Sequence, residues 1–255
     1  MGFTQTELFS FLEEKCIEYN QPAFIGSDPI SIPHHFSKKQ DIEIAGFLTA
    51  TISWGNRKSI VANGHRLMQI MDNSPYDFLC NATPKDFKPF LRFVHRTFNG
   101  DDCLFFLTSL RHIYSQHQSL EPLFGTMNEH GAAYAISRFR EIFLSTDHLD
   151  RSEKHIANPL GGSAAKRINM FLRWMVRHDY RGVDFGIWKS INASNLICPL
   201  DVHAGNVARK LGLLQRTTND WKAAEELTAN LRKFDPGDPV KYDFALFGLG
   251  VFEKF

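Results

Sequence analysis

The chain has 255 residues, of which 43% are hydrophobic and 22% are charged, and its formal net charge is +1. That length fits one large domain or two small ones with adequate cores, and no apolar run reaches the roughly 20 residues that a membrane-spanning helix needs. The balanced charge excludes a uniformly basic surface for nucleic acid, so any DNA-binding face has to be local.

The cysteines and the N-terminal segment point to the cytoplasm. Cys16, Cys80, Cys103 and Cys198 show neither the pairing nor the spacing of a metal site, so we expect reduced thiols and no iron–sulfur cluster. Residues 1–21 are amphipathic and contain acidic residues, which is unlike a secretory signal. We therefore expect a cytoplasmic protein, associated with the nucleoid if it binds DNA.

Apolar residues recur at helical spacing along most of the chain. A capping box at 4–7 starts the first predicted helix, and residues 20–33 carry the prolines and glycines of a connecting loop. Further apolar stripes predict helices at 44–52, from about 58, at 85–98, 104–114, 132–144, from 166, after 201, at 221–231 and from Asp238-Pro239 to 249, with 115–130 as a polar connection. No segment alternates like a strand, so the sequence predicts an all-α protein of about ten helices.

Residues 158–214 contain the residues on which a functional reading depends. Gly161-Gly162 form a tight turn, for which glycine supplies positive φ, and Lys166 follows in the first turn of a helix. Asp201 directly precedes another helix, where a carboxylate can cap the free amides. The sequence thus presents a lysine and an aspartate, each at a helix start.

The helix from residue 166 carries a predicted basic face. Arg173 and Arg177 each lie within about 20° of Lys166 around the helix axis. Such a face is commonly just solvated. The turn ahead of it, however, can offer backbone amides to a phosphate, which suits a DNA backbone.

Three motifs, in the same order, resemble the helix-hairpin-helix base-excision DNA glycosylases, the superfamily of endonuclease III and the 8-oxoguanine glycosylases. Leu160-x-Gly162-x-x-x-Lys166 looks like the hairpin with the catalytic lysine, and residues 200–213, beginning Leu-Asp-Val-His, resemble the segment with the catalytic aspartate. Residues 44–53 are similar to the helix that opens the superfamily's helical barrel. The resemblance extends loosely over residues 41–214.

The resemblance implies a two-lobed fold with a hairpin and a cleft that holds Lys166 and Asp201. The lobes would be residues 41–180 and residues 1–40 with 181–255. Lys166 would attack C1′ of a flipped nucleotide, kept neutral by burial and by neighbouring Arg167 and Arg173, while Asp201 would support the developing charge. Residues expected to contact DNA are Gly161, Gly162, Ser163, Arg167, Arg173, Asn56, Arg57 and His203, and Trp54 and Trp188 are expected to stack on a base.

The expected partner is double-stranded DNA with a damaged base, bound by a monomer that carries at most a structural Na⁺ or K⁺ at the hairpin. Lys166 and Asp201 are 35 residues apart, an interval closer to the archaeal 8-oxoguanine glycosylase branch, which favours an oxidised purine as substrate. The insert 184–188 fills the extra length, and Gly162-Ser163-Ala164 replaces the commoner Gly-x-Gly. As a whole, the chain resembles an uncharacterised bacterial family related to these glycosylases.

Other interpretations stay open at this point. Asp201 can be a simple helix cap, His203 a packed or capping residue, and either tryptophan a core residue. The chain can also be a DNA- or partner-binding protein that has the fold without catalysis. A metal-dependent phosphohydrolase is a further alternative, with His155, His178-Asp179 and Asp243 as its candidate residues.

Overall fold

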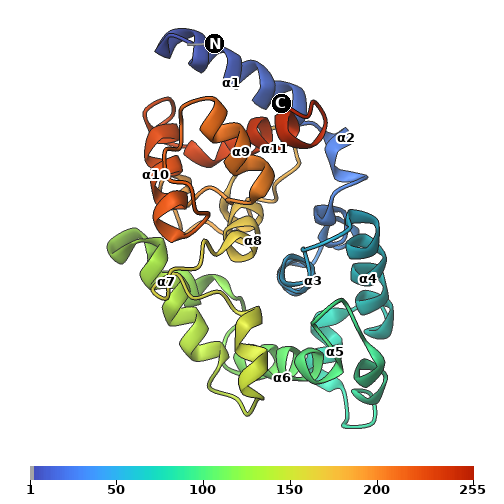
Figure 1. The fold of residues 1–255 in the computed structure, drawn as a ribbon. Coiled ribbons are helices and arrows are strands. Elements are labelled where there is room, and N and C mark those ends of the chain that lie inside the picture. Colours follow the sequence, from blue (N-terminus) through green and yellow to red (C-terminus); the bar gives the residue numbers. More distant parts are fainter. Residues whose placement is uncertain (1–2) are drawn as a thin grey trace.

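The computed structural model describes residues 3–255 and is built from helices (Figure 1). Within these residues there is no β-strand, only isolated bridges, so the all-α prediction is confirmed. The α-helices are α1 (Gln5–Tyr19), α2 (Pro22–Ile25), α3 (Lys39–Thr51), α4 (Arg57–Ile70), α5 (Pro75–Asn81), α6 (Gly100–Gln116), α7 (Met127–Phe143), α8 (Lys166–Val176), α9 (Val202–Lys210), α10 (Trp221–Arg232) and α11 (Asp243–Val251). Seven 3-10 helices connect them: η1 (Pro29–Ser31), η2 (Pro33–His35), η3 (Lys88–Arg92), η4 (Glu121–Phe124), η5 (Asp150–His155), η6 (Ala193–Asn195) and η7 (Pro239–Tyr242).

Side-chain caps explain where several helices begin. The predicted capping box of α1 is formed, because Thr4 accepts from the Glu7 amide and the Glu7 carboxylate accepts from the Thr4 amide. Asp201 caps α9 by accepting from the Ala204 amide at 2.9 Å, as its place before an apolar period predicts.

The helices pack in two groups joined through the middle of the molecule. At one end α1 lies on α11, which also packs on α9, and at the other end α5 packs on α6 (Figure 1). Between these ends α3 packs on α8, and η1 and η2 pack on α3. Helix α8, which begins at Lys166, therefore lies where the two ends of the molecule meet.

An aromatic cluster forms the core around α3. The ring of Phe47 lies 5.3–5.9 Å, between centroids, from the rings of Phe106, Phe139, Phe143 and Phe171. Such pairs contribute about 0.5–1.5 kcal/mol each beyond the area they bury. They join α6, α7 and α8 to α3, so the middle of α8 is packed into the core.

The core helix predicted at residues 85–98 does not form. Only the 3-10 helix η3 is present, with Pro89 near its start, where proline lacks an amide donor. Phe90 and Phe93 are fully buried, whereas Leu91 and Val94 are 52% and 56% exposed. Only part of the apolar stripe is thus buried, and a short 3-10 turn rather than an α-helix buries it.

The predicted loop at 20–33 and the polar connection at 115–130 contain short helices. Residues 20–33 include α2 and η1, and residues 115–130 include η4 and the beginning of α7. Helix α7 is kinked at Gly131, whose φ is +81°. No helix among residues 3–255 is long and apolar enough to cross a membrane.

Candidate functional site

A cleft of about 1240 Å³ opens where the two groups of helices meet. Its walls come from the segment 24–29, the loop 53–58 with α4, one face of α8, the start of α9, and α11. Because these segments are far apart in the sequence, only the folded chain brings their side chains to one place.

Lys166 and Asp201 face each other in this cleft. The distance from Lys166 Nζ to Asp201 Oδ2 is 4.0 Å, and the two side chains are 29% and 27% exposed. Lys166 is the first residue of α8, preceded by Ala165 in the left-handed region with φ +51°. The structure therefore brings together two groups from two different helix starts and leaves both accessible to a ligand.

Residues 219–221, which we call the bracket, connect Asp201 to the turn before Lys166. The Asn219 side-chain amide donates to the Asp201 carbonyl at 3.0 Å, and the Trp221 amide donates to the Gly162 carbonyl at 3.1 Å. One short segment thus contacts both sides of the lysine–aspartate pair.

The glycine turn is exposed, but its amides are already hydrogen-bonded. Gly161 and Ser163 donate to the Asn158 carbonyl, and Gly162 donates to the Pro159 carbonyl at 2.8 Å. The expectation that these amides stand free for a phosphate is therefore wrong for the unbound protein. Gly162 has φ +89°, as the turn requires of a glycine.

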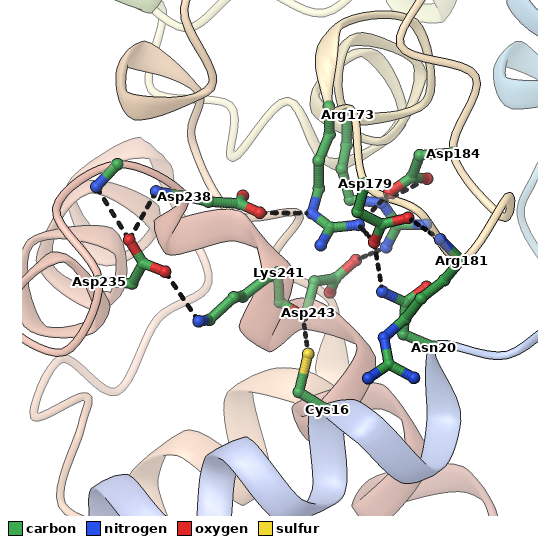
Figure 2. Close-up of polar contacts among 12 residues, drawn as sticks. Cys16, Asn20, Arg173, Asp179, Arg181, Asp184, Asp235, Asp238, Lys241 and Asp243 are labelled. Atoms are coloured by element: carbon green, nitrogen blue, oxygen red, sulfur yellow. Dashed lines mark hydrogen bonds and ion pairs between the residues drawn. The ribbon is translucent and has the colours of Figure 1, made fainter.

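Arg173 and Arg177 do not form the predicted basic face. They are 4% and 3% exposed and pair with a network of aspartates, and Arg173, labelled in Figure 2, is buried in the cleft wall together with Asp243. Arg173 pairs with Asp184 at 3.2 Å and with Asp243, and Arg177 pairs with Asp179, Asp184 and Asp238 at 2.7–3.1 Å. Arg173 is therefore not a surface contact for DNA, and its charge is already balanced by two carboxylates, so it cannot be the unpaired neighbour that keeps Lys166 neutral.

The same network extends to both ends of the chain (Figure 2). Asp179 accepts from the Asn20 side chain at 2.6 Å, and Lys241 pairs with Asp235 at 2.7 Å. The carbonyl of Lys241 accepts from the Cys16 thiol at 3.3 Å. Helix α8 is in this way joined to α1 and to the segment ahead of α11.

Arg167 and Trp54 form a second unit beside the cleft. Arg167 donates to the Thr51 carbonyl at 2.5 Å, and its guanidinium lies 4.8 Å from the centre of the Trp54 ring. Burial lowers the pKa of Arg167 to about 10. The donors of Arg167 face the backbone, so Arg167 supports the ring of Trp54. Trp54 is half-buried and lines the cleft, so it remains a candidate for stacking on a base.

Asn56, Arg57 and His203 all line the cleft, as a DNA-contacting role requires. Asn56 caps α4 by accepting from the Ser59 amide at 3.2 Å. The guanidinium of Arg57 lies 4.9 Å from the centre of the Phe247 ring of α11, so it reaches across the cleft mouth. His203 is exposed at the start of α9.

Trp188 is not a base-stacking residue. It is 1% exposed, lies 5.5 Å from Phe124 and 5.4 Å from Phe171 between ring centroids, and is absent from the cleft walls. Its indole donates to Glu43 at 2.6 Å. Glu43 also accepts from the Tyr114 hydroxyl at 2.7 Å, and this buried carboxylate explains why the insert at 184–188 is folded inward.

The structure adds cleft residues that sequence reasoning did not identify as binding residues. Asp28, Met170 and Trp174 line the cleft together with Asp243 and Phe247. Met170 and Trp174 follow Lys166 by four and eight residues, a helical spacing that could have indicated them. Asp28 precedes a proline in the segment that was predicted to be a connecting loop, so nothing in the sequence indicated a binding role.

The residues of the alternative phosphohydrolase centre do not come together. Asp179 pairs with Arg177 and Asp243 pairs with Arg173, while His155 is buried 3.4 Å from Asp102. In the part of the chain that the structure describes, no three His, Cys, Asp or Glu residues are grouped so as to hold a metal ion.

Comparison with known proteins gives a family but no activity. Neither the curated proteins nor the solved structures contain a match to the chain. Residues 28–252 match the family described as "Protein of unknown function (DUF2400)". This match covers all the walls of the cleft except Phe24, Gly26 and Ser27. The chain therefore belongs to the DUF2400 family.

Proposed function

We propose that this protein is a DNA glycosylase with AP lyase chemistry, related to the helix-hairpin-helix superfamily, that excises a damaged base through Lys166 and Asp201. The observation that carries the proposal is the 4.0 Å approach of a lysine nitrogen to a carboxylate in a cleft of about 1240 Å³. A flipped nucleotide needs such a cleft, and cleavage of its glycosidic bond needs a nucleophile and an anion at one place.

The chemistry assigns one role to each group. Asp201 Oδ2 takes a proton from the Lys166 ammonium, and the free amine attacks C1′ while the C1′–N bond breaks and its electrons leave with the base. The base takes up the proton from Asp201, which restores the carboxylate. One proton then moves from the alkylated Lys166 nitrogen to O4′ while the C1′–O4′ bond breaks, and the C1′ adduct becomes a protonated Schiff base. Asp201 also stabilises the positive charge that develops on the sugar.

Contacts around the pair support the same assignment. Asp201 Oδ1 is held by the Ala204 amide at 2.9 Å, which leaves Oδ2 for Lys166. Trp54, Asn56 and Arg57 line the opposite wall, where an aromatic ring, an amide and an arginine suit the bases and phosphates of a duplex.

Borohydride trapping tests the proposal. Wild-type protein should become covalently linked to duplexes that carry 8-oxoguanine or an abasic site, because borohydride reduces a Schiff base to a stable amine. Lys166→Gln should give no adduct and still bind DNA. Lys58→Gln is the matched control, since it removes an exposed lysine from the same cleft and should trap at the wild-type yield.

Asp201→Asn separates the cap from the charge. Asparagine caps a helix about as well as aspartate, so stability should change by less than about 1 kcal/mol, while excision falls by orders of magnitude. Trapping by Lys166→Gln at the wild-type yield would place the nucleophile elsewhere. If wild-type protein binds duplex DNA but neither excises 8-oxoguanine nor traps on either lesion, it is a DNA-binding protein without glycosylase activity.

A further inference from the structure

Asp28 is a buried carboxylate in the cleft wall without a cation of its own. It is 7% exposed, and burial raises its pKa despite the positive charges of Arg173, Arg57 and Lys166. Among residues 3–255 the other buried acids each have a basic side chain within 4.0 Å, whereas Asp28 forms no ion pair; these other acids are Glu43, Asp102, Asp184 and Asp243. Folding therefore retains an acid here that is not balanced by a basic partner.

One oxygen of Asp28 is engaged and the other is open. Oδ1 accepts from the Ile30 amide at 3.1 Å, which fixes the carboxylate at the start of η1. Oδ2 has no hydrogen bond within residues 3–255, and the residue lines the cleft. An oxygen that is open to the cleft can accept from a ligand, and N–H groups that donate to a carboxylate form strong hydrogen bonds.

Trp174 supplies a matching unpaired donor. Its ring is fully buried, lines the same cleft, and has an indole Nε1 without a hydrogen-bond partner in the described residues. Buried indole N–H groups usually find an acceptor. A carbonyl oxygen of a bound ligand is the kind of group that would satisfy it.

The cleft walls also contain aromatic and apolar side chains. Phe24 and Phe247 lie 5.7 Å apart between ring centroids in an edge-to-face arrangement, and Met170 lines the α8 side. Aromatic and thioether side chains pack well against the faces of a planar ring. The cleft therefore fits a heterocycle whose edge carries both N–H donors and a carbonyl.

We infer that Asp28 and Trp174 read the Watson–Crick edge of a guanine-type base. Asp28 accepts from the 2-amino group with Oδ2 and from N1–H with the lone pair of Oδ1 that Ile30 leaves free, and Trp174 donates to O6. Of the four common bases, only guanine offers two adjacent donors beside a carbonyl, and two parallel bonds to one carboxylate are strong and specific. This inference rests on the proposed glycosylase function and assigns its base-specificity residues.

The test compares two lesions that differ by one group. Wild-type protein should excise 8-oxoguanine at least about 10-fold more efficiently, in kcat/KM, than 8-oxohypoxanthine, which lacks only the 2-amino group. Asp28→Asn keeps the acceptor for Ile30 but presents an amide in place of the second oxygen, so its preference should fall to within about 3-fold. Asp101→Asn, an exposed acid in the first turn of α6, should keep the wild-type preference.

Trapping on an abasic site tests the lysine chemistry separately from base recognition, because that substrate has no base for Asp28 to contact. Asp28→Asn should trap there at the wild-type yield, which also shows that the variant is folded. If the variant keeps the full wild-type preference between the two lesions, or if the wild type has none, the assignment of Asp28 is wrong while the glycosylase function stands. If the wild type neither excises nor traps, the proposed function fails and the inference fails with it.

Discussion

Replacing Arg173 with methionine tests whether the arginine of α8 is structural or available to DNA. Removing it leaves Asp243 without a basic partner, whereas Asp184 keeps Arg177 at 3.1 Å. Truncating one partner of a buried ion pair usually costs 3–5 kcal/mol, and since only one carboxylate loses its cation we expect about 3 kcal/mol. Urea unfolding followed by circular dichroism at pH 7.5 measures this loss.

Arg138→Met is the matched control, because Arg138 pairs with Glu141 on the surface, where the side chains are 51% and 63% exposed. That change should cost less than about 1 kcal/mol. In the variant Arg173→Met/Asp243→Asn the uncompensated carboxylate is gone, so part of the lost stability should return. Equal, small effects of Arg173→Met and Arg138→Met would refute the structural role.

The loss should also depend on pH. Burial raises the pKa of Asp243 to about 6, and without Arg173 it should rise further above the value of 3.8 for the unfolded chain. An acid with a raised pKa favours the folded state at low pH, and this contribution is lost as pH rises through the folded-state pKa. Arg173→Met should therefore be less destabilising at pH 5 than at pH 8. If Arg173 instead contacted a phosphate, the slope of log K against log salt would fall by about 0.9.

Two further sites and one pH profile give independent predictions. Trp188→Phe should cost about 1–3 kcal/mol in urea unfolding, because Glu43 loses a buried donor, and should leave DNA affinity unchanged; a loss of affinity would return Trp188 to the DNA site. Gly162→Ala should cost about 1–2 kcal/mol since φ is +89°, whereas Gly26→Ala, with φ −58° and open space around it, should cost under about 0.5 kcal/mol. Burial lowers the pKa of His155 from 6.5 to about 4, so the neutral His155 is favoured in the folded protein. Its contribution to the free energy of unfolding is complete above pH 6.5 and declines towards pH 4 by up to about 1.4 kcal/mol per pH unit. His155→Gln should flatten that part of the profile, and an unchanged profile would contradict it.

Local signals in the sequence were sufficient for most of the helices, though not for α2 and α5, and for placing Lys166 and Asp201 at helix starts, whereas their meeting in one cleft was expected from the family resemblance. Capping chemistry placed the start of α1, and the cap by Asp201 follows from a carboxylate ahead of an apolar period. The helix predicted at 85–98 was wrong, because Phe90 and Val94 fit a helical period although Pro89 favours a short 3-10 turn. Periodicity alone does not distinguish the two in so short a stretch.

The prediction of an exposed basic face on α8 was wrong for a different reason. Spacing showed that Arg173 shares a face of α8 with Lys166, but it cannot show what covers that face. The partners of Arg173 are 11 and 70 residues away in the sequence, and Glu43 is 145 residues from Trp188. Long-range partners of this kind decide whether a polar residue is a ligand contact or part of the core, and a single sequence does not reveal them.

The bracket at residues 219–221 has a consequence for the order in which the protein is made. Both Lys166 and Asp201 leave the ribosome before residue 219, yet the hydrogen bonds to Gly162 and to the Asp201 carbonyl form only after Trp221 has followed. A nascent chain that ends before residue 219 thus contains both reactive groups but lacks the two hydrogen bonds of the bracket. Both sides of the lysine–aspartate pair are thus held by a segment that is synthesised after them.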